Sequence, residues 1–184
     1  MDLRVKKTER AIRSAFFALV QEKPIEKITV REIAARAEIN KTTFYAHYET
    51  VYALIAALEQ EAVDEILEQL DDAPQFLTDP RSFVRSLYDA MQMCRSDNII
   101  FLGITSQDFV NRLRSAMIEK LSAQNIMFQQ YSDVGALMVF LVSGLIGVQK
   151  VMQLEAADPR LEYLFSFVEN GLRALPPVGP DDSP

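Results

Sequence analysis

Apolar residues recur at helical spacing along most of this 184-residue chain, and no stretch alternates between apolar and polar residues as a half-buried strand does. Ile12, Ala15, Phe16 and Leu19 lie three or four positions apart, which places them on one face of a helix over residues 8–22. The same spacing predicts long helices that begin near residues 51, 80, 106, 132 and 159, and shorter pieces lie between them. The chain is therefore predicted to be all-α, with about nine helices.

Bulk composition limits the class of protein further. Nearly half of the residues (49%) are hydrophobic, which excludes a disordered chain. The single cysteine, Cys94, excludes an intramolecular disulfide framework and is interpreted as a core thiol rather than a redox sensor. The basic N-terminus lacks a following apolar segment, and the most apolar run, residues 134–148, is shorter than the roughly 20 residues of a membrane span. A cytoplasmic protein is expected.

The net charge of −7 hides an asymmetry between the two ends of the chain. Residues 1–50 contain ten lysines and arginines against seven acidic residues, a net charge of +3. The rest contains nine against nineteen, a net charge of −10. A weakly basic N-terminal part on an acidic body suits a chain in which only the first part contacts a polyanion, although scattered surface charge gives the same count.

The strongest local signals lie between residues 29 and 48. Thr29 and Glu32 have the spacing of a capping box at the start of a helix that ends near Ala37. Asn40 is a good cap for a third short helix, which begins at Lys41. Two helices joined by so short a turn are typical of a helix-turn-helix, whose second helix enters the major groove of DNA.

The short helix that follows Asn40 divides into two faces. Phe44 and Tyr48 lie four positions apart and are expected to pack inward together with Ile39. The opposite face has no carboxylate and is rich in hydroxyl and cationic groups, which are common ligands of DNA phosphates and bases. Its members are Lys41, Thr42, Thr43, Tyr45 and, near the end, His47.

The segment ITVREIAARAEINKTTFYAHYETVYALIAAL, residues 28–58, resembles the DNA-binding domain of the TetR family of bacterial transcriptional regulators. The resemblance covers residues of about 8–60 and includes the cap, the core and the contact positions; beyond residue 60 only the helical layout agrees. It implies that Thr29, Thr43, Tyr45 and His47 bind phosphate, and that Arg31, Lys41 and Thr42 lie at base edges. Asn40 is placed in the same interface because it caps the helix.

Two positions depart from the family pattern. Glu38 stands in the turn, where the family usually has glycine, and costs on the order of 1 kcal/mol if its φ angle is positive. Val51 stands at the start of the fourth helix, where a lysine often contacts phosphate, which predicts a weaker grip on the backbone.

The remaining residues are predicted to form an effector-binding and dimerisation domain over 51–175, after a DNA-binding domain over 1–50 and before a disordered tail over 176–184. A Phe- and Met-rich set is the candidate ligand pocket, although a plain core explains each member equally well. This set comprises Phe83, Leu87, Tyr88, Met91, Phe101, Phe109 and Met117. Pairing of the last two helices across a two-fold axis, as the resemblance implies, gives a candidate dimer interface of Leu141, Leu145, Val148, Leu161, Phe165 and Val168.

These features together predict a homodimeric regulator that represses transcription from a palindromic DNA operator and is released by a small-molecule effector. No cofactor or metal site is expected, because no Cys/His cluster exists in the sequence. A small all-α enzyme is disfavoured because its single His and single Cys lie in separate segments. A family member that acts through protein contacts without binding DNA stays as the alternative.

Overall fold

The computed structural model describes residues 3–70, 78–93, 107–124, 134–152, 154 and 158–173. Within these ranges the chain is helical and contains no strand, which confirms the all-α prediction. The eight α-helices described are α1 (Leu3–Val20), α2 (Val30–Arg36), α3 (Lys41–His47), α4 (Val51–Gln69), α5 (Pro80–Met93), α6 (Gln107–Gln124), α7 (Val134–Met152) and α8 (Pro159–Arg173). A short 3-10 helix, η1 (Ile25–Lys27), precedes α2. The apolar piece expected over 99–104 lies outside the described residues.

The chain divides into two compact units, a head (Met1–Leu58) and a body (Glu59–Pro184). Helix α4 crosses the boundary, since its first eight residues fall in the head and the remainder in the body. The tail predicted over 176–184 lies outside the described residues. No helix among those described is long and apolar enough to span a membrane.

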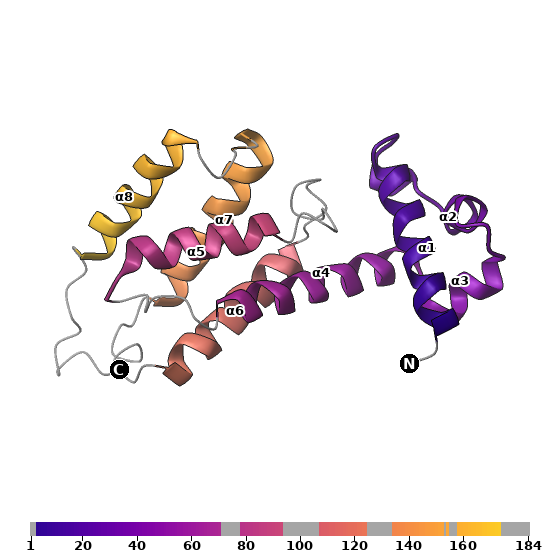
Figure 1. Ribbon diagram of the computed structural model, residues 1–184, viewed down its shortest axis with the longest axis horizontal. Helices are drawn as coiled ribbons and strands as arrows, with labels where there is room; N and C mark the ends of the chain where they lie inside the picture. The colour runs from indigo at the N-terminus through magenta and orange to yellow at the C-terminus, as the bar shows by residue number, and fades with distance from the viewer. Residues whose placement is uncertain are drawn as a thin grey trace. The chain divides into compact units, whose positions relative to one another are not determined.

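The head is a bundle of the first three helices and the start of α4 (Figure 1). Helix α1 begins at Leu3, earlier than the residue-8 start predicted, and buries the expected stripe of Ile12, Ala15, Phe16 and Leu19. Helices α1 and α2 pack together, as do α2 and α3. Ile33 and Phe44, both fully buried, are the inward residues of these two short helices. Helices this short are marginal alone, so packing on α1 keeps them folded.

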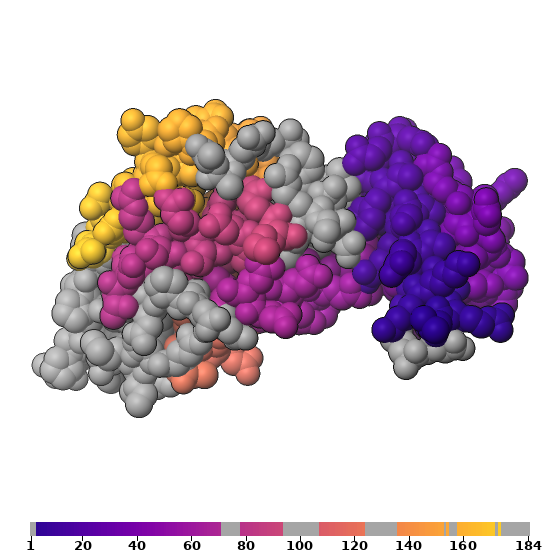
Figure 2. Space-filling view, viewed as in Figure 1, coloured from indigo at the N-terminus to yellow at the C-terminus, as the bar shows by residue number. Residues whose placement is uncertain are grey.

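The body is built from two pairs of long helices, α5 with α8 and α6 with α7. Helix α8 lies along α5 in both the ribbon and the space-filling views (Figures 1 and 2). Helix α5 buries an apolar stripe that includes Phe83, Leu87 and Met91, and α8 buries Leu161 and Phe165. Acidic caps begin both helices: Asp79 Oδ1 accepts from the Ser82 amide at 3.2 Å, and Asp158 Oδ1 accepts from the Arg160 amide at 2.9 Å.

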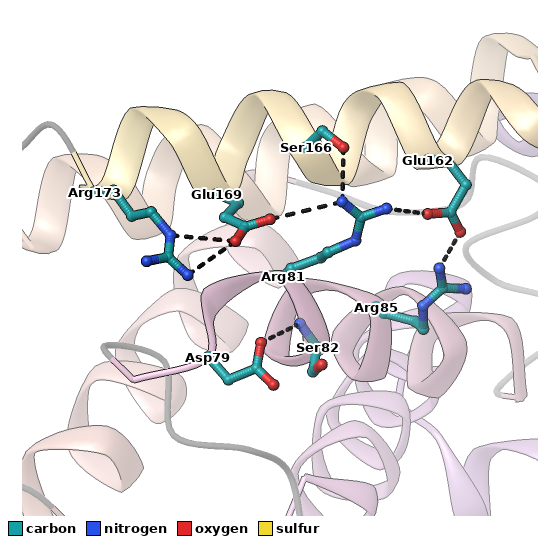
Figure 3. A network of polar contacts seen from close by, with 8 residues as sticks. All are labelled: Asp79, Arg81, Ser82, Arg85, Glu162, Ser166, Glu169 and Arg173. Carbon is teal, nitrogen blue, oxygen red and sulfur yellow. Dashed lines mark hydrogen bonds and ion pairs between the residues drawn. The ribbon is translucent and has the colours of Figure 1, made fainter.

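Arginines of α5 bind carboxylates of α8 along the half-exposed edge of this helix pair (Figure 3). Arg81 donates to Glu162 at 2.5 Å and to the Ser166 hydroxyl at 2.9 Å, and Arg85 donates to the other oxygen of Glu162. These two guanidinium groups, Arg85 first, lower the pKa of the Glu162 carboxyl below its ordinary value. Arg85 also lies 5.1 Å from the centre of the Phe165 ring.

Helix α4 is joined to α6 by a buried charge pair. Glu59 is 2% exposed, and its carboxylate accepts a hydrogen bond of 2.6 Å from Arg112 on α6. Further along the same helices, Lys120 donates to the carbonyl of Leu67 at 2.8 Å. The Leu67 carbonyl also accepts from the Leu70 amide at 3.1 Å, so Lys120 is a second donor to one of the last carbonyls of α4.

Candidate nucleic-acid interface

Helix α2 begins with the capping box that its sequence predicts. The Thr29 hydroxyl accepts from the Glu32 amide at 3.3 Å, and the Glu32 carboxylate accepts from the Thr29 amide at 3.0 Å. Glu32 is also paired with Lys23, and this hydrogen bond is the largest cause that lowers the pKa of Glu32 from 4.5 to about 2. The Glu32 carboxylate is therefore ionised at neutral pH, and the ammonium group of Lys23 balances its charge.

The turn between α2 and α3 places Glu38 in the left-handed region, with φ of 55°. The Glu38 amide donates to the Ala35 carbonyl at 3.3 Å, and the Ile39 amide donates to the Ala34 carbonyl at 3.0 Å. These two bonds form a Schellman motif, in which the first residue past the helix is usually glycine. The departure noted at Glu38 therefore carries a backbone strain.

Helix α3 has the two faces expected of it. Phe44 is fully buried, with Tyr45 and Tyr48 rings each 5.9 Å from its centre. Lys41, Thr42 and Tyr45 are exposed, and Tyr45 retains 53% of its surface. Helix α3 therefore presents a cation, a hydroxyl and a phenol on its outer face, while the buried Phe44 ring anchors its inner face.

Two of the predicted phosphate ligands are engaged inside the head. Thr43 donates its hydroxyl to Asn40 Oδ1 at 2.9 Å, and the same oxygen caps α3 by accepting from the Thr43 amide at 2.6 Å. The Thr29 hydroxyl donates to Glu32 at 2.8 Å. Each hydroxyl can still accept, but it must release its own acceptor before it can donate to a phosphate.

Arg31 and His47 flank this surface differently. Arg31 is exposed on α2, whereas His47 is half-buried and its Nδ1 lies 3.5 Å from Glu9 on α1. The Glu9 contact leaves the second ring nitrogen of His47 for another partner, and sequence reasoning did not anticipate it because the two residues are far apart in the chain. The structure thus groups all eight predicted DNA-binding residues on α2, α3 and their caps.

In the body, the described members of the predicted ligand pocket are all buried, and Phe101 and Cys94 lie outside the described residues. A polar cluster accompanies them, which the sequence did not reveal. The Tyr88 hydroxyl lies 3.0 Å from Gln149 Oε1 and 2.9 Å from the Leu154 carbonyl, and Gln92 donates to the Tyr88 oxygen at 2.7 Å. Among the described residues, no group of histidine, cysteine and carboxylate side chains is placed to hold a metal ion.

The residues predicted for the dimer interface mostly face the interior of the single chain. Leu141, Leu145, Leu161, Phe165 and Val168 are buried, and Val148 is half-buried. Other apolar side chains of the same two helices are exposed: Val139, Phe140, Val151 and Met152 on α7, and Tyr163 and Phe167 on α8. These exposed side chains lie on the outer faces of α7 and α8.

Comparison with known proteins agrees with this arrangement. Residues 12–58 match the family model described as bacterial regulatory proteins, tetR family. The match ends at Leu58, the last residue of the head, so it covers the TetR-like helix-turn-helix and the start of α4.

Solved structures extend the likeness to the whole chain. A TetR-family regulatory protein from Rhodococcus RHA1 is 19% identical, with 97% of this chain and 100% of that chain covered and a TM-score of 0.59. The TetR-family repressor AlkX from Dietzia sp. strain DQ12-45-1b, implicated in biodegradation of n-alkanes, is 14% identical, with 95% and 99% covered and a TM-score of 0.55. No curated protein matches by sequence. The chain therefore shares the fold of these TetR-family structures.

Proposed function

We propose that this protein is a homodimeric repressor that binds a palindromic operator and leaves it when a small molecule binds the body. The observation that supports DNA binding most directly is the outer face of α3, where Lys41, Thr42 and Tyr45 are exposed around the buried Phe44. This is the geometry of a recognition helix, whose outward side chains reach bases and phosphates in the major groove.

Dimerisation through the outer faces of α7 and α8 is supported by the exposed apolar residues there. Phe140 and Phe167 retain 57% and 64% of their surface, which is costly unless a partner covers them. A Cβ added at Gly144 or Gly147 would meet nothing within 4 Å, so neither glycine is needed for packing inside the chain. Both would instead allow a second helix to approach closely. A charge at Leu145, by contrast, would enter the body's own core.

Effector control is proposed to act through α4, because this helix belongs to both units. An effector shifts the equilibrium only if it binds the two states with different affinity. The α4–α6 contacts, Glu59 with Arg112 and Leu67 with Lys120, are the groups through which a change in the body would reach α4.

The deciding experiment is selection of operator DNA by the purified protein, followed by a salt titration of the selected site. Lys41→Ala is expected to weaken binding and to reduce the salt slope by about one unit, because one phosphate contact is lost. Lys27→Ala, which removes an exposed lysine that is not among the predicted DNA ligands, is the matched control and should leave the slope unchanged. Selection that yields no enriched sequence would favour the alternative, a family member that acts through protein contacts.

A further inference from the structure

The head contains a pocket of about 290 Å³ between η1, the start of α2, α3 and the start of α4. Its floor is aliphatic, formed by Ile25, Ile28, Val30 and Val51. Ile28 is buried and the other three are half-buried, so the floor is part of the packed head rather than an open edge. Pockets of this kind, apolar with a few polar groups at the rim, are the usual form of small-molecule sites.

Two tyrosines also line the pocket and are unusually exposed. Tyr45, on α3, retains 53% of its surface, and Tyr52, in the first turn of α4, retains 69%. Aromatic rings at a pocket rim attract cations through their negative faces.

The charged residues of the lining are both acidic. Glu26 on η1 and Glu49 before α4 line the pocket, which contains no lysine or arginine. Both are exposed, and neither forms a hydrogen bond or ion pair with any residue that the structure describes. Val51, which also lines the pocket, is apolar and does not neutralise these carboxylates. Two carboxylates beside two phenol rings over an aliphatic floor select a positively charged, partly apolar ligand.

We propose that this pocket binds an organic cation, an amine or quaternary ammonium group carried on a small apolar body. The apolar part lies on the aliphatic floor, and the charged nitrogen lies between Tyr45 or Tyr52 and the carboxylates of Glu26 and Glu49. Because Tyr45 also lies on the outer face of α3, a bound cation covers its ring and competes with DNA. Only this competition rests on the proposed function; the binding itself does not.

The probe for the test is benzyltrimethylammonium, and its control is neopentylbenzene, the neutral isostere in which carbon replaces nitrogen. The full chain is labelled with 3-fluorotyrosine, so that each of its six tyrosines reports by ¹⁹F NMR, with resonances assigned through Tyr→Phe variants. We expect the probe to shift the Tyr45 and Tyr52 resonances while those of Tyr88 and Tyr163 in the body stay unchanged. The neutral isostere should bind at least about tenfold more weakly than the probe.

Substitutions test the charge requirement. Glu26→Gln with Glu49→Gln is expected to weaken probe binding about tenfold, whereas Glu65→Gln, at an exposed position of α4 outside the pocket, should not change it. A shift at Tyr88 instead of Tyr45 and Tyr52, equal binding of the neutral isostere, or no shift at all would each overturn the proposed cation site. If the probe shifts Tyr45 and Tyr52 yet operator DNA does not displace it, the pocket stands and the DNA contact assigned to Tyr45 is refuted.

Discussion

In the head, the polar contacts that define α2 and α3 join residues three positions apart, Thr29 with Glu32 and Asn40 with Thr43. In the body, Arg81 binds Glu162 across 81 positions of sequence, and Arg112 binds Glu59 across 53. The helix starts of α2 and α3 in the head are therefore fixed by residues close in sequence. The body, by contrast, has side-chain contacts that form only when helices distant in sequence pack together. Loss of one local contact should therefore affect a single helix end, whereas loss of a distant pair should weaken the packing of two helices.

The largest expected effect comes from breaking the buried pair in the body. Arg112→Met should lower the free energy of unfolding by about 3 kcal/mol, because it removes the guanidinium that binds the 2%-exposed carboxylate of Glu59. This loss lies at the low end of the range for removing one partner of a buried ion pair, because the Arg112 side chain is 35% exposed. Chemical denaturation at fixed protein concentration measures it.

Two further variants isolate the pair. Arg160→Met removes an exposed arginine whose ion pair, among the described residues, is with the nearby Asp158, so it should cost much less than Arg112→Met. The double variant Glu59→Met with Arg112→Met should recover much of the loss, because no unpaired charge remains buried. Equal losses for Arg112→Met and Arg160→Met would show that distance along the chain does not separate the two kinds of contact.

The next largest effect tests whether the outer face of the body meets a second copy. Gly144→Leu places a large side chain where the chain itself has nothing within 4 Å, so the fold of the single chain should be unharmed. The dissociation constant of the dimer should rise at least about tenfold, because α7 can no longer approach the second copy closely. Sedimentation equilibrium measures the dissociation constant, and circular dichroism checks that helix content is kept.

The control for this variant is Ser115→Leu, at an exposed position of α6. It adds a side chain of similar size to the body's surface away from α7 and α8, and it should leave dimerisation unchanged. An intact dimer in Gly144→Leu would place the interface elsewhere and leave the exposed Phe140 and Phe167 in need of another partner.

A smaller effect is expected in the head, where single contacts act separately. Tyr45→Phe removes one exposed hydroxyl from α3 and should weaken operator binding by about 1 kcal/mol, with stability unaffected. Ser115→Ala removes an exposed hydroxyl from α6, a helix outside both proposed interfaces, and should bind the operator as the unchanged protein does. Fluorescence anisotropy with labelled operator measures both; equal affinity of Tyr45→Phe and the unchanged protein would remove Tyr45 from the interface.

The difference between contacts that are local in sequence and contacts that are distant in sequence also explains what the sequence could predict. The caps Thr29 and Asn40 are found in the structure because each acts within one turn of its own helix. The inward position of Phe44 follows from helical spacing alone. These signals are local, so they survive without knowledge of the fold.

The body could be predicted only as far as its helices. Helical spacing identified Leu145 and Phe165 as apolar-face residues, but it could not tell whether the chain's own core or a second copy covers that face. The pairs Arg81–Glu162 and Tyr88–Gln149 depend on which helices become neighbours, and nothing within one helix encodes that choice. The pocket in the head could not be predicted for the same reason, since Ile25 and Tyr52 come from separate elements.

The smallest effect concerns the one strained residue between the two short helices of the head. Glu38 has φ of 55°, a conformation that costs an L-residue about 1–2 kcal/mol and glycine almost nothing. Glu38→Gly should therefore raise the free energy of unfolding by about 0.5–1 kcal/mol, after the greater freedom of glycine in the unfolded chain is subtracted. Thermal denaturation measures the change.

The matched control is Ala35→Gly, three positions earlier and exposed on α2, where the backbone is helical. The same product residue there should lower stability by about 1 kcal/mol, because glycine is a poor helix former. Opposite signs for two glycines so close together would show that the turn geometry, not glycine itself, decides the outcome. A loss of stability in Glu38→Gly would mean that the carboxylate of Glu38 contributes a contact that outweighs its backbone strain.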